Sequence, residues 1–247
     1  MDLGLTGKVF LVTGGSRGLG RAGAEVLLAE GASVVISART RAAVAATAEE
    51  LGCIGLAADL SAPGTAQQLV DVALSSYGRL DGALLSVGGP PAGATLDLTD
   101  EQWQSAFDSV FLGAIRLSRA VVGALPPEGG ALALVLSTSV KAPIAGLAAS
   151  NGLRPGLGML AKTMADELGP RGVRVNGLLP GRVLTDRIRQ LEGDDPAVAE
   201  RNAAAIPLRR YGQPAEFGRV AAFLLSPAAS YVTGAMVPVD GGAVRAL

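Results

Sequence analysis

The chain has 247 residues, of which 49% are hydrophobic and 17% are charged, and this balance excludes an intrinsically disordered chain. The 21 Lys and Arg residues and the 22 Asp and Glu residues leave a formal net charge of -1, which gives no electrostatic reason to expect nucleic acid or an anionic membrane as a partner. The sequence holds no histidine and a single cysteine, Cys53, which excludes Ser-His-Asp and Cys-His catalysis, His-ligated and multi-thiolate metal sites, and an intrachain disulfide.

The chain start lacks a basic segment followed by an apolar core, which is the pattern of a secretory signal. The longest clean apolar runs, such as residues 131–136, have the length of a strand and fall far short of the roughly 20 residues that a membrane-spanning helix needs. We therefore expect a cytoplasmic protein that does not enter a membrane.

Short apolar runs alternate along the chain with longer stretches of helical periodicity. The predicted strands are, in chain order, 9–12, 33–37, 54–58, 83–85, 132–136, 173–178 and 236–239. The predicted helices run from 19 to a stop at Gly31 and then over 41–51, 63–77, about 99–125, about 148–168 and 216–225. Thr99 and Gln102 fit a capping box at the start of the fourth helix, and Gly169-Pro170 is typical of the end of the fifth.

Strands that are apolar throughout and separated by helices indicate a parallel sheet covered on both faces. The sequence shows no composition shift, linker or internal repeat. We therefore predict a single doubly wound, Rossmann-type α/β domain over residues 1–247, with about seven parallel strands. Residues 183–212 have weak periodicity, and they are predicted to form a mobile loop insert with short helices that contributes to the substrate site.

A glycine-rich turn, Thr13-Gly14-Gly15-Ser16-Arg17-Gly18-Leu19-Gly20, joins the first predicted strand to the first predicted helix. Glycines permit a tight turn and let backbone N–H groups approach a pyrophosphate at the positive end of the helix. No Gly-Lys-Ser/Thr follows, so the turn is not a P-loop. The pattern predicts a dinucleotide site, with an ordinary strand-to-helix turn as the alternative.

The end of the second predicted strand reads Ser37-Ala38-Arg39-Thr40 and carries no carboxylate for a ribose 2′-hydroxyl. Arg39, with Arg17 in the glycine-rich turn, is suited to bind a 2′-phosphate through charge-assisted hydrogen bonds. This favours NADP(H) over NAD(H). The alternative is that both arginines are merely solvated surface residues.

Several spaced motifs resemble the short-chain dehydrogenase/reductase family over essentially the whole chain, with the 3-oxoacyl-carrier-protein reductase-like members as the nearest kin. The resemblance is carried by TGxxxGxG at Thr13 to Gly20, Asp59-Leu60 after the third strand, PGxxxT at Pro180-Gly181-x-Val183-x-Thr185, the segment 206–216, and Val239-Asp240-Gly241-Gly242. It implies that Asp59 and Leu60 contact adenine and that residues 180–185 line the nicotinamide. Gly88 belongs to an altered form of the family's Asn-Ala-Gly motif, Ser86-Val87-Gly88, and is expected to contact the cofactor.

The family's catalytic Asn, Ser, Tyr and Lys are mostly replaced here. By the resemblance, Ser150 stands where the Tyr should be, Arg154 where the Lys should be, and Val110 where the Asn should be. Ser137 matches the family's Ser, thirteen residues before Ser150, although Thr138 and Ser139 leave this register open. Since serine is a weaker acid than tyrosine and arginine does not deprotonate, Ser150 is a poor replacement for the proton donor, and the proton is expected to come from water or from the substrate. Ser137 is expected to hydrogen-bond a substrate oxygen, and Arg154, on the same helix face as Ser150, to bind the ribose hydroxyls or stabilise an oxyanion. The alternative is that Ser150 and Arg154 are remnants in a site with no redox role.

Three hypotheses follow. The first is an NADP(H)-dependent, ketoreductase-like oxidoreductase with atypical proton transfer, acting on a small-molecule or carrier-bound substrate. The second is a non-redox enzyme of the same fold (a dehydratase, cyclase or isomerase) or a nucleotide-binding regulator. The third is a non-catalytic partner subunit. Arg182, Arg187 and Lys141 could bind an anionic substrate. The resemblance also implies a homo-oligomer, a tetramer or a dimer, in which the long helix carrying Trp103 and Phe107 packs against its mate.

Overall fold

The computed structural model describes residues 2–193 and 195–246, and within them seven strands form one sheet. All neighbouring strands pair in parallel, in the order β3-β2-β1-β4-β5-β6-β7. The strands are β1 (Val9–Thr13), β2 (Ser33–Ala38), β3 (Ile54–Ala57), β4 (Gly82–Leu85), β5 (Gly130–Val135), β6 (Val173–Pro180) and β7 (Met236–Val239). The predicted doubly wound sheet is confirmed.

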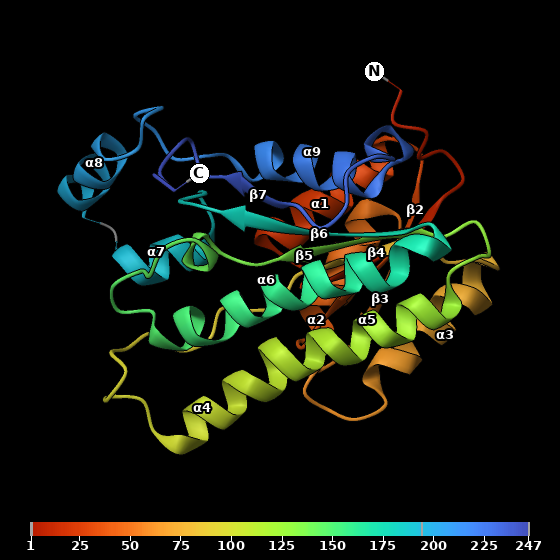
Figure 1. Ribbon diagram of the computed structural model, residues 1–247, viewed down its shortest axis with the longest axis horizontal. Coiled ribbons are helices and arrows are strands. Elements are labelled where there is room, and N and C mark those ends of the chain that lie inside the picture. Colours follow the sequence, from red (N-terminus) through yellow and green to blue (C-terminus); the bar gives the residue numbers. More distant parts are fainter. Residues whose placement is uncertain (1, 194, 247) are drawn as a thin grey trace.

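Helices cover both faces of this sheet (Figure 1). They are α1 (Gly18–Ala29), α2 (Arg41–Leu51), α3 (Thr65–Tyr77), α4 (Asp100–Ala106), α5 (Gly113–Ala124), α6 (Ala148–Leu168), α7 (Asp186–Glu192), α8 (Pro196–Ala204) and α9 (Pro214–Leu225). Short 3₁₀ segments are η2 (Thr138–Val140), η3 (Gly169–Arg171) and η4 (Pro227–Ala229), and a π-helical segment, η1, spans Phe107–Leu112.

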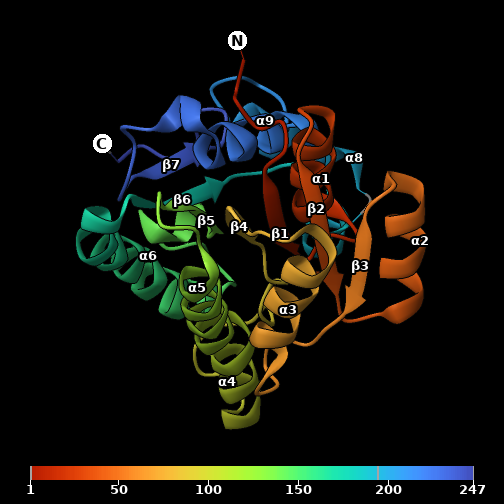
Figure 2. The same cartoon turned by 90° about the vertical axis from the view of Figure 1, so that its right-hand side faces the viewer.

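Each face of the sheet has its own hydrophobic core, because side chains alternate between faces along a strand. In β1, Val9 and Leu11 belong to one core, and Phe10 and Val12 belong to the other. The first core packs under α3, α5 and α6, and the second under α1, α2 and α9. Figure 2 shows these two groups of helices on opposite sides of the strands. Burial on both faces explains why the strand sequences are apolar throughout.

The long helix predicted over about 99–125 is interrupted by a π turn. Its start is as predicted: Thr99 Oγ1 accepts from Gln102 N at 3.3 Å, and Gln102 Oε1 accepts from Thr99 N at 2.9 Å. Between α4 and α5, however, η1 inserts a wider turn that contains Val110. The hydrophobic period does not reveal a single inserted residue, and π turns of this kind occur often at functional sites.

The segment 183–212 contains two short helices, α7 and α8, as predicted. Both lie at the end of the molecule toward which the arrowhead of β6 points (Figure 1). Glu192, the last residue of α7, joins the two ends of this segment. Arg182 Nε donates to Glu192 Oε1 at 2.7 Å, and the Tyr211 hydroxyl donates to Glu192 Oε2. Across residues 2–193 and 195–246, no helix has the length and apolar character needed to cross a bilayer.

Some strand ends differ from their predicted positions. β6 continues to Pro180, two residues beyond the predicted end, because Leu179 and Pro180 pair with Pro238 and Val239 of β7. Proline lacks the N–H group that a central strand requires, and the next residue continues the pairing: Gly181 N donates to Val239 O at 3.1 Å. Pairing with a distant strand, and not local sequence, determines where this strand ends.

Candidate functional site

The candidate site lies at the carboxyl edge of the sheet, where β1, β4, β5 and β6 all end. The ends of β1 and β4 are joined by Thr13, whose Oγ1 donates to Ser86 O and accepts from Ser86 N, both at 2.9 Å. This edge is where ligands bind in open α/β sheets, at the point where the strand order reverses between β1 and β4. The topology therefore places the site before any side chain is considered.

The glycine-rich turn predicted to hold a pyrophosphate is closely packed at this edge. Gly14 has φ of +61°, and a Cβ there would lie 2.6 Å from the Ser86 carbonyl oxygen. A Cβ at Gly20 would lie 2.4 Å from the Gly14 carbonyl oxygen. Both contacts are shorter than real Cβ atoms make, so the turn requires glycine at both positions.

The N-terminus of α1 has backbone N–H groups that no capping side chain satisfies. The N-cap residue, Arg17, is extended and makes no side-chain cap, and its neighbour Ser16 is half-buried. Arg17 is mainly exposed and its Nη1 lies 4.0 Å from Asp186 Oδ2 of α7. Unsatisfied N–H groups and the helix dipole together make this end of α1 suited to a phosphate. Leu19 packs its side chain against the core under α1 and so contributes only backbone here.

Residues 180–185 lie beside the glycine-rich turn, although not all of their side chains face it. Thr185 is the N-cap of α7, and its Cγ2 lies 3.6 Å from the position of a Cβ on Gly18. Val183 is buried, at 4% exposed, and bridges to Gly212 of the chain that follows α8. Pro180 ends β6, and Gly181 packs against Asp240 after β7. Among these predicted cofactor residues, Thr185 is the one with a side chain next to the turn.

Arg39 lines a cavity of about 600 Å³ beside the carboxyl ends of β2 and β3. The cavity is shared with Asp59 and Ser61 and with polar side chains of α4 and η1: Asp100, Glu101, Gln104, Ser105, Asp108 and Ser109. Hydrogen bonds to Asp59 from Ser61 N, at 2.9 Å, and from Ser61 Oγ, at 2.8 Å, lower the pKa of the Asp59 carboxyl, and the charge of Arg39 lowers it further. Arg39 and Asp59, which were both predicted to contact the cofactor, thus lie in the same cavity.

Two other predicted contacts lie at the rim of this region. Leu60 follows Asp59 and packs against the long helix, where a Cβ on Gly113 would lie 2.9 Å from the Leu60 carbonyl oxygen. Gly88 is exposed after β4, with open space on the side where a Cβ would stand. The residues present therefore fit an adenine dinucleotide: glycines and free amides for its phosphates, and a polar cavity that contains Arg39 and Asp59 for its adenosine end.

Ser139, and not the predicted Ser137, contacts Ser150. The Oγ atoms of Ser139 and Ser150 are 3.1 Å apart, and both residues are buried. Ser137 Oγ instead accepts from Ser139 N at 3.1 Å and caps the short helix η2. The spacing of thirteen residues pointed to Ser137, but the turn of η2 places the side chain two residues later against α6. The neighbouring Thr138 and Ser139 were the only sign in the sequence that this register was open.

Arg154 is buried one turn after Ser150 on α6, at 6% exposed. Its Nη1 donates to Val135 O at 2.7 Å and to Leu136 O at 2.6 Å, which are the last carbonyls of β5 and the following residue. Burial lowers the pKa of Arg154 to about 10, and the positive charge of Arg187 contributes to this. Arg154 therefore still carries its charge at neutral pH, and it places that charge at the end of β5.

Asn151 is a site residue that sequence reasoning missed. Asn151 Oδ1 accepts from Ile144 N at 3.0 Å, and its Nδ2 donates to Ile144 O at 2.8 Å, so one side chain fixes the loop between η2 and α6. The same loop pairs with the loop after β4, because Gly93 N donates to Gly146 O at 2.8 Å and Ala148 N donates to Gly93 O at 3.2 Å. These bonds join two loops that the sequence separates by about fifty residues, and no local pattern reveals them.

No group of three or more Cys, Asp and Glu side chains suited to a metal ion occurs in the part of the chain that the structure describes. The sequence prediction of no metal stays a prediction. The chemistry available at the carboxyl edge consists of hydroxyl groups, guanidinium groups and backbone amides.

Comparison with known proteins shows that the chain is similar to oxidoreductases over nearly its whole length. The family profile described as enoyl-(acyl carrier protein) reductase matches residues 14–244. An uncharacterized oxidoreductase of Mycobacterium tuberculosis is 34% identical, over 96% of this chain and 92% of its own. The 3-oxoacyl-[acyl-carrier-protein] reductase of Vibrio harveyi is 32% identical, over 97% of this chain and 98% of its own. The crystal structure of L-sorbose reductase from Gluconobacter frateurii, complexed with NADPH and L-sorbose, superposes with a TM-score of 0.91 and 30% identity over the whole of both chains.

Proposed function

Because the chain belongs to the short-chain dehydrogenase/reductase family of oxidoreductases, we propose that it is an NADP(H)-dependent ketoreductase whose proton transfer does not use a tyrosine. The observation that carries the proposal is the pairing, at one edge of the sheet, of a glycine-rich turn suited to a dinucleotide with two buried serine hydroxyls beside a buried arginine. The NADPH in the L-sorbose reductase structure supports the choice of coenzyme.

Gly14, Gly18 and Gly20 would let the pyrophosphate approach the backbone at the start of α1, and Arg39 would bind the 2′-phosphate at the cavity beside Asp59. When bound, the nicotinamide supplies a hydride to the carbonyl carbon, while the carbonyl oxygen takes up a proton to give an alcohol. The coenzyme is oxidised and the carbonyl is reduced by two electrons, so the reaction balances without a further reductant.

The Ser139–Ser150 pair is suited to hold the carbonyl oxygen of the substrate. Each hydroxyl has one proton to donate, and a hydroxyl that is bonded to its neighbour can turn to donate to a third oxygen. Arg154 adds a fixed positive charge one helical turn away, where negative charge develops on the oxygen. Its own bonds to Val135 O and Leu136 O keep this charge in place.

The proton itself must come from another source than a phenol. The three tyrosines of the chain lie elsewhere: Tyr77 ends α3, Tyr211 donates to Glu192, and Tyr231 is fully exposed. We infer that water delivers the proton to the oxygen that the two serines hold. The absence of a placed general acid is expected to lower the rate by about a hundredfold or more against relatives that have one.

NADPH oxidation measured by absorbance tests the proposal, with a panel of ketones and β-ketoacyl thioesters as substrates and NADH as the comparison coenzyme. We expect turnover with NADPH and at least one carbonyl compound. Tight NADPH binding in calorimetry without turnover of any member of the panel would contradict the ketoreductase function. Conversion of a substrate with no change in the nicotinamide would instead identify the non-redox alternative.

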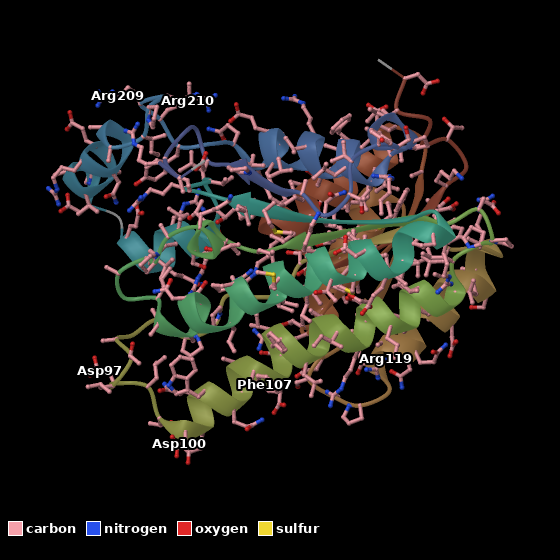
Figure 3. The ribbon with its side chains drawn as sticks, in the orientation of Figure 1. Asp97, Asp100, Phe107, Arg119, Arg209 and Arg210 are labelled. Atoms are coloured by element: carbon pink, nitrogen blue, oxygen red, sulfur yellow. The ribbon has the colours of Figure 1, made fainter. Side chains whose placement is uncertain are left out.

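We also propose that two copies pack through α6 and the long helix α4-η1-α5. Phe107 is 39% exposed and stacks on Phe111, with ring centroids 5.2 Å apart. Phe107 lies along the edge of the molecule on this helix (Figure 3). Gly152 and Gly156 leave room on α6 for the rings of Trp103 and Phe111. Analytical ultracentrifugation should give a dimer or tetramer, and a Phe107→Asp variant should shift it toward monomer.

A further inference from the structure

Two arginines at the carboxyl edge, Arg154 and Arg187, bond to backbone carbonyls and to no carboxylate in the part of the chain that the structure describes. Arg187 projects from the first turn of α7, and its Nη2 donates to Pro90 O of the loop after β4 at 2.8 Å. Its guanidinium lies against Gly89, where a Cβ would stand 2.6 Å from Nε. Arg154 reaches the same region from α6, and the two positive charges are close enough for Arg187 to lower the pKa of Arg154.

Both guanidinium groups are bonded to backbone carbonyls, which carry no net charge. Within residues 2–193 and 195–246, neither Arg154 nor Arg187 takes part in an ion pair. Burial lowers the pKa of Arg187 as it does that of Arg154, and no acidic side chain offsets either effect. Two like charges held close together in a partly desolvated site repel each other, and an anion between them relieves this repulsion.

The neighbours of Arg187 on the same segment are different. Arg182 Nε lies 2.7 Å from Glu192 Oε1, and Arg189 Nη1 lies 3.1 Å from Asp186 Oδ1. Arg187 lies between these two arginines in sequence, yet it alone among the three turns toward the site and away from a carboxylate. The segment contains acidic residues, so the lack of a partner is specific to the arginine at the site.

The position of the pair suggests what the anion is attached to. Arg154 lies one turn from Ser150 on α6, and Ser150 bonds to Ser139, so Arg154 links the hydroxyls proposed to hold the carbonyl oxygen to the region of Arg187. A guanidinium matches a carboxylate by forming two parallel hydrogen bonds, and the bond from Arg187 to Pro90 O uses only one of its five N–H groups. A carboxylate placed a few bonds from the reacting carbonyl would meet Arg187 while the carbonyl meets the serines.

We propose that the substrate is an oxo acid, with its carboxylate bound by Arg187 and its carbonyl at Ser139 and Ser150. This rests on the proposed carbonyl reduction and adds the substrate class and the residue that selects it. Arg187 is then a specificity-determining residue, and Arg154 contributes charge from its fixed place at the end of β5. The product is the corresponding hydroxy acid.

The test compares acids with their own methyl esters, using benzoylformate and acetoacetate as the two acids and NADPH as the coenzyme. For the wild type we expect kcat/KM to be about tenfold or more higher for the acid than for the ester in at least one pair. Arg187→Gln should remove that preference, because it should lower kcat/KM for the acid about tenfold more than kcat/KM for the ester. Arg187→Lys should restore part of it, and Arg189→Gln, at an exposed position two residues later on the same helix, should leave it unchanged.

Other results would overturn the inference. An equal kcat/KM for acid and ester in the wild type would do so while leaving the ketoreductase function intact. A loss of NADPH affinity in Arg187→Gln, with the acid preference retained, would assign Arg187 to the coenzyme. If no compound is turned over, calorimetry of NADP⁺-loaded protein with oxamate and with neutral oxamide decides: binding of oxamate that Arg187→Gln abolishes supports the anion site, and no difference between the two compounds refutes it.

Discussion

At the amino edge of the sheet, the buried carboxylate of Asp81 is matched by two opposite charges, whereas at the carboxyl edge two arginines bond to backbone carbonyls. Asp81, 6% exposed, accepts from Val9 N at 2.9 Å, from Arg79 Nε at 2.8 Å and from Lys8 Nζ at 3.1 Å. Arg154 and Arg187 have carbonyl partners alone. The first arrangement pairs its charges within the fold, and we propose that the second is completed by the carboxylate of a substrate.

The amino edge also ties elements together through backbone carbonyls. Arg174, near the start of β6, donates to Leu224 O at 2.7 Å and to Ser226 O at 2.9 Å, at the end of α9. Such bonds satisfy carbonyls that a helix end leaves without partners. The side chains at the amino edge thus bond to neighbouring elements of the fold, and those at the carboxyl edge are the ones that we propose take part in binding and chemistry.

The largest effect is expected at the amino edge, from Asp81→Asn. Loss of the carboxylate leaves Arg79 and Lys8 without their counter-charge, and the free energy of unfolding should fall by about 3 kcal/mol. Urea denaturation measures this change, and kcat of the folded fraction should stay within about twofold of the wild type. A large loss of kcat with unchanged stability would break the proposed division between the edges.

Because of the same carboxylate, we expect the stability of the protein to depend on pH in the acid range. Burial opposes ionisation of Asp81, but the bonds from Arg79, Val9 and Lys8 outweigh it and hold the pKa of Asp81 below its usual value. A pKa lowered by folding stabilises the protein above the usual value of 3.8 and ceases to do so as the pH falls below it. The wild type should therefore lose stability toward pH 3 more steeply than Asp81→Asn.

Ser139→Ala should give the largest effect at the carboxyl edge. Removal of one hydroxyl from the proposed carbonyl contact should lower kcat/KM by about tenfold to a hundredfold, while the melting temperature changes little. Steady-state kinetics measure the loss, with Ser75→Ala on the exposed side of α3 as the control. If Ser137→Ala were the variant that lost activity, the pairing of Ser139 with Ser150 would not be the catalytic one.

A smaller effect is expected from Arg39→Ala at the adenosine end. The Kd for NADPH should rise about tenfold and the Kd for NADH should hardly change, since only the former carries a 2′-phosphate. Calorimetry measures both constants. Arg119, an exposed arginine of α5 far from α7 and α8, provides the control variant Arg119→Ala (Figure 3). An equal loss for both coenzymes would show that Arg39 acts on the adenine pocket as a whole.

The smallest effect concerns pH. Serine does not titrate near neutrality, the chain has no histidine, and the pKa of Arg154 is lowered only to about 10. We expect kcat to vary by less than about threefold between pH 6 and 9. A bell-shaped profile in this range would reveal a titrating acid or base that water delivery does not require.

Local sequence was enough to predict those helices whose ends are marked by their own residues. The bounds of α2 are as predicted because Gly52 adopts the left-handed conformation that ends a helix, and α6 is followed by Gly169-Pro170. The π turn at Phe107–Leu112 was not predictable, because it adds one residue to a helical turn without a visible break in the pattern of apolar positions. The carboxyl end of β6 depends on β7, about sixty residues later.

The candidate site was predictable to a similar degree. The glycine-rich turn and Arg39 were found because spacing and charge indicate them directly, and their binding roles remain predictions. The contact between Ser139 and Ser150 depends on the short turn η2, and that of Arg187 depends on α7 folding back to the loop after β4. Neither fold-back has a signature in the local sequence, so these partners could only come from the three-dimensional structure.

The two loops bordering the site are fixed to each other by peptide groups. The side chain of Asn151 hydrogen-bonds to the backbone of Ile144, and the backbone of Gly93 hydrogen-bonds to the backbones of Gly146 and Ala148. Small side chains along this border, such as Ala142 and Ala145, are therefore not needed to keep the chain path. Exchanging them for larger or more polar ones would reshape the entrance while the framework stays as it is, which makes this border the natural place to redesign selectivity.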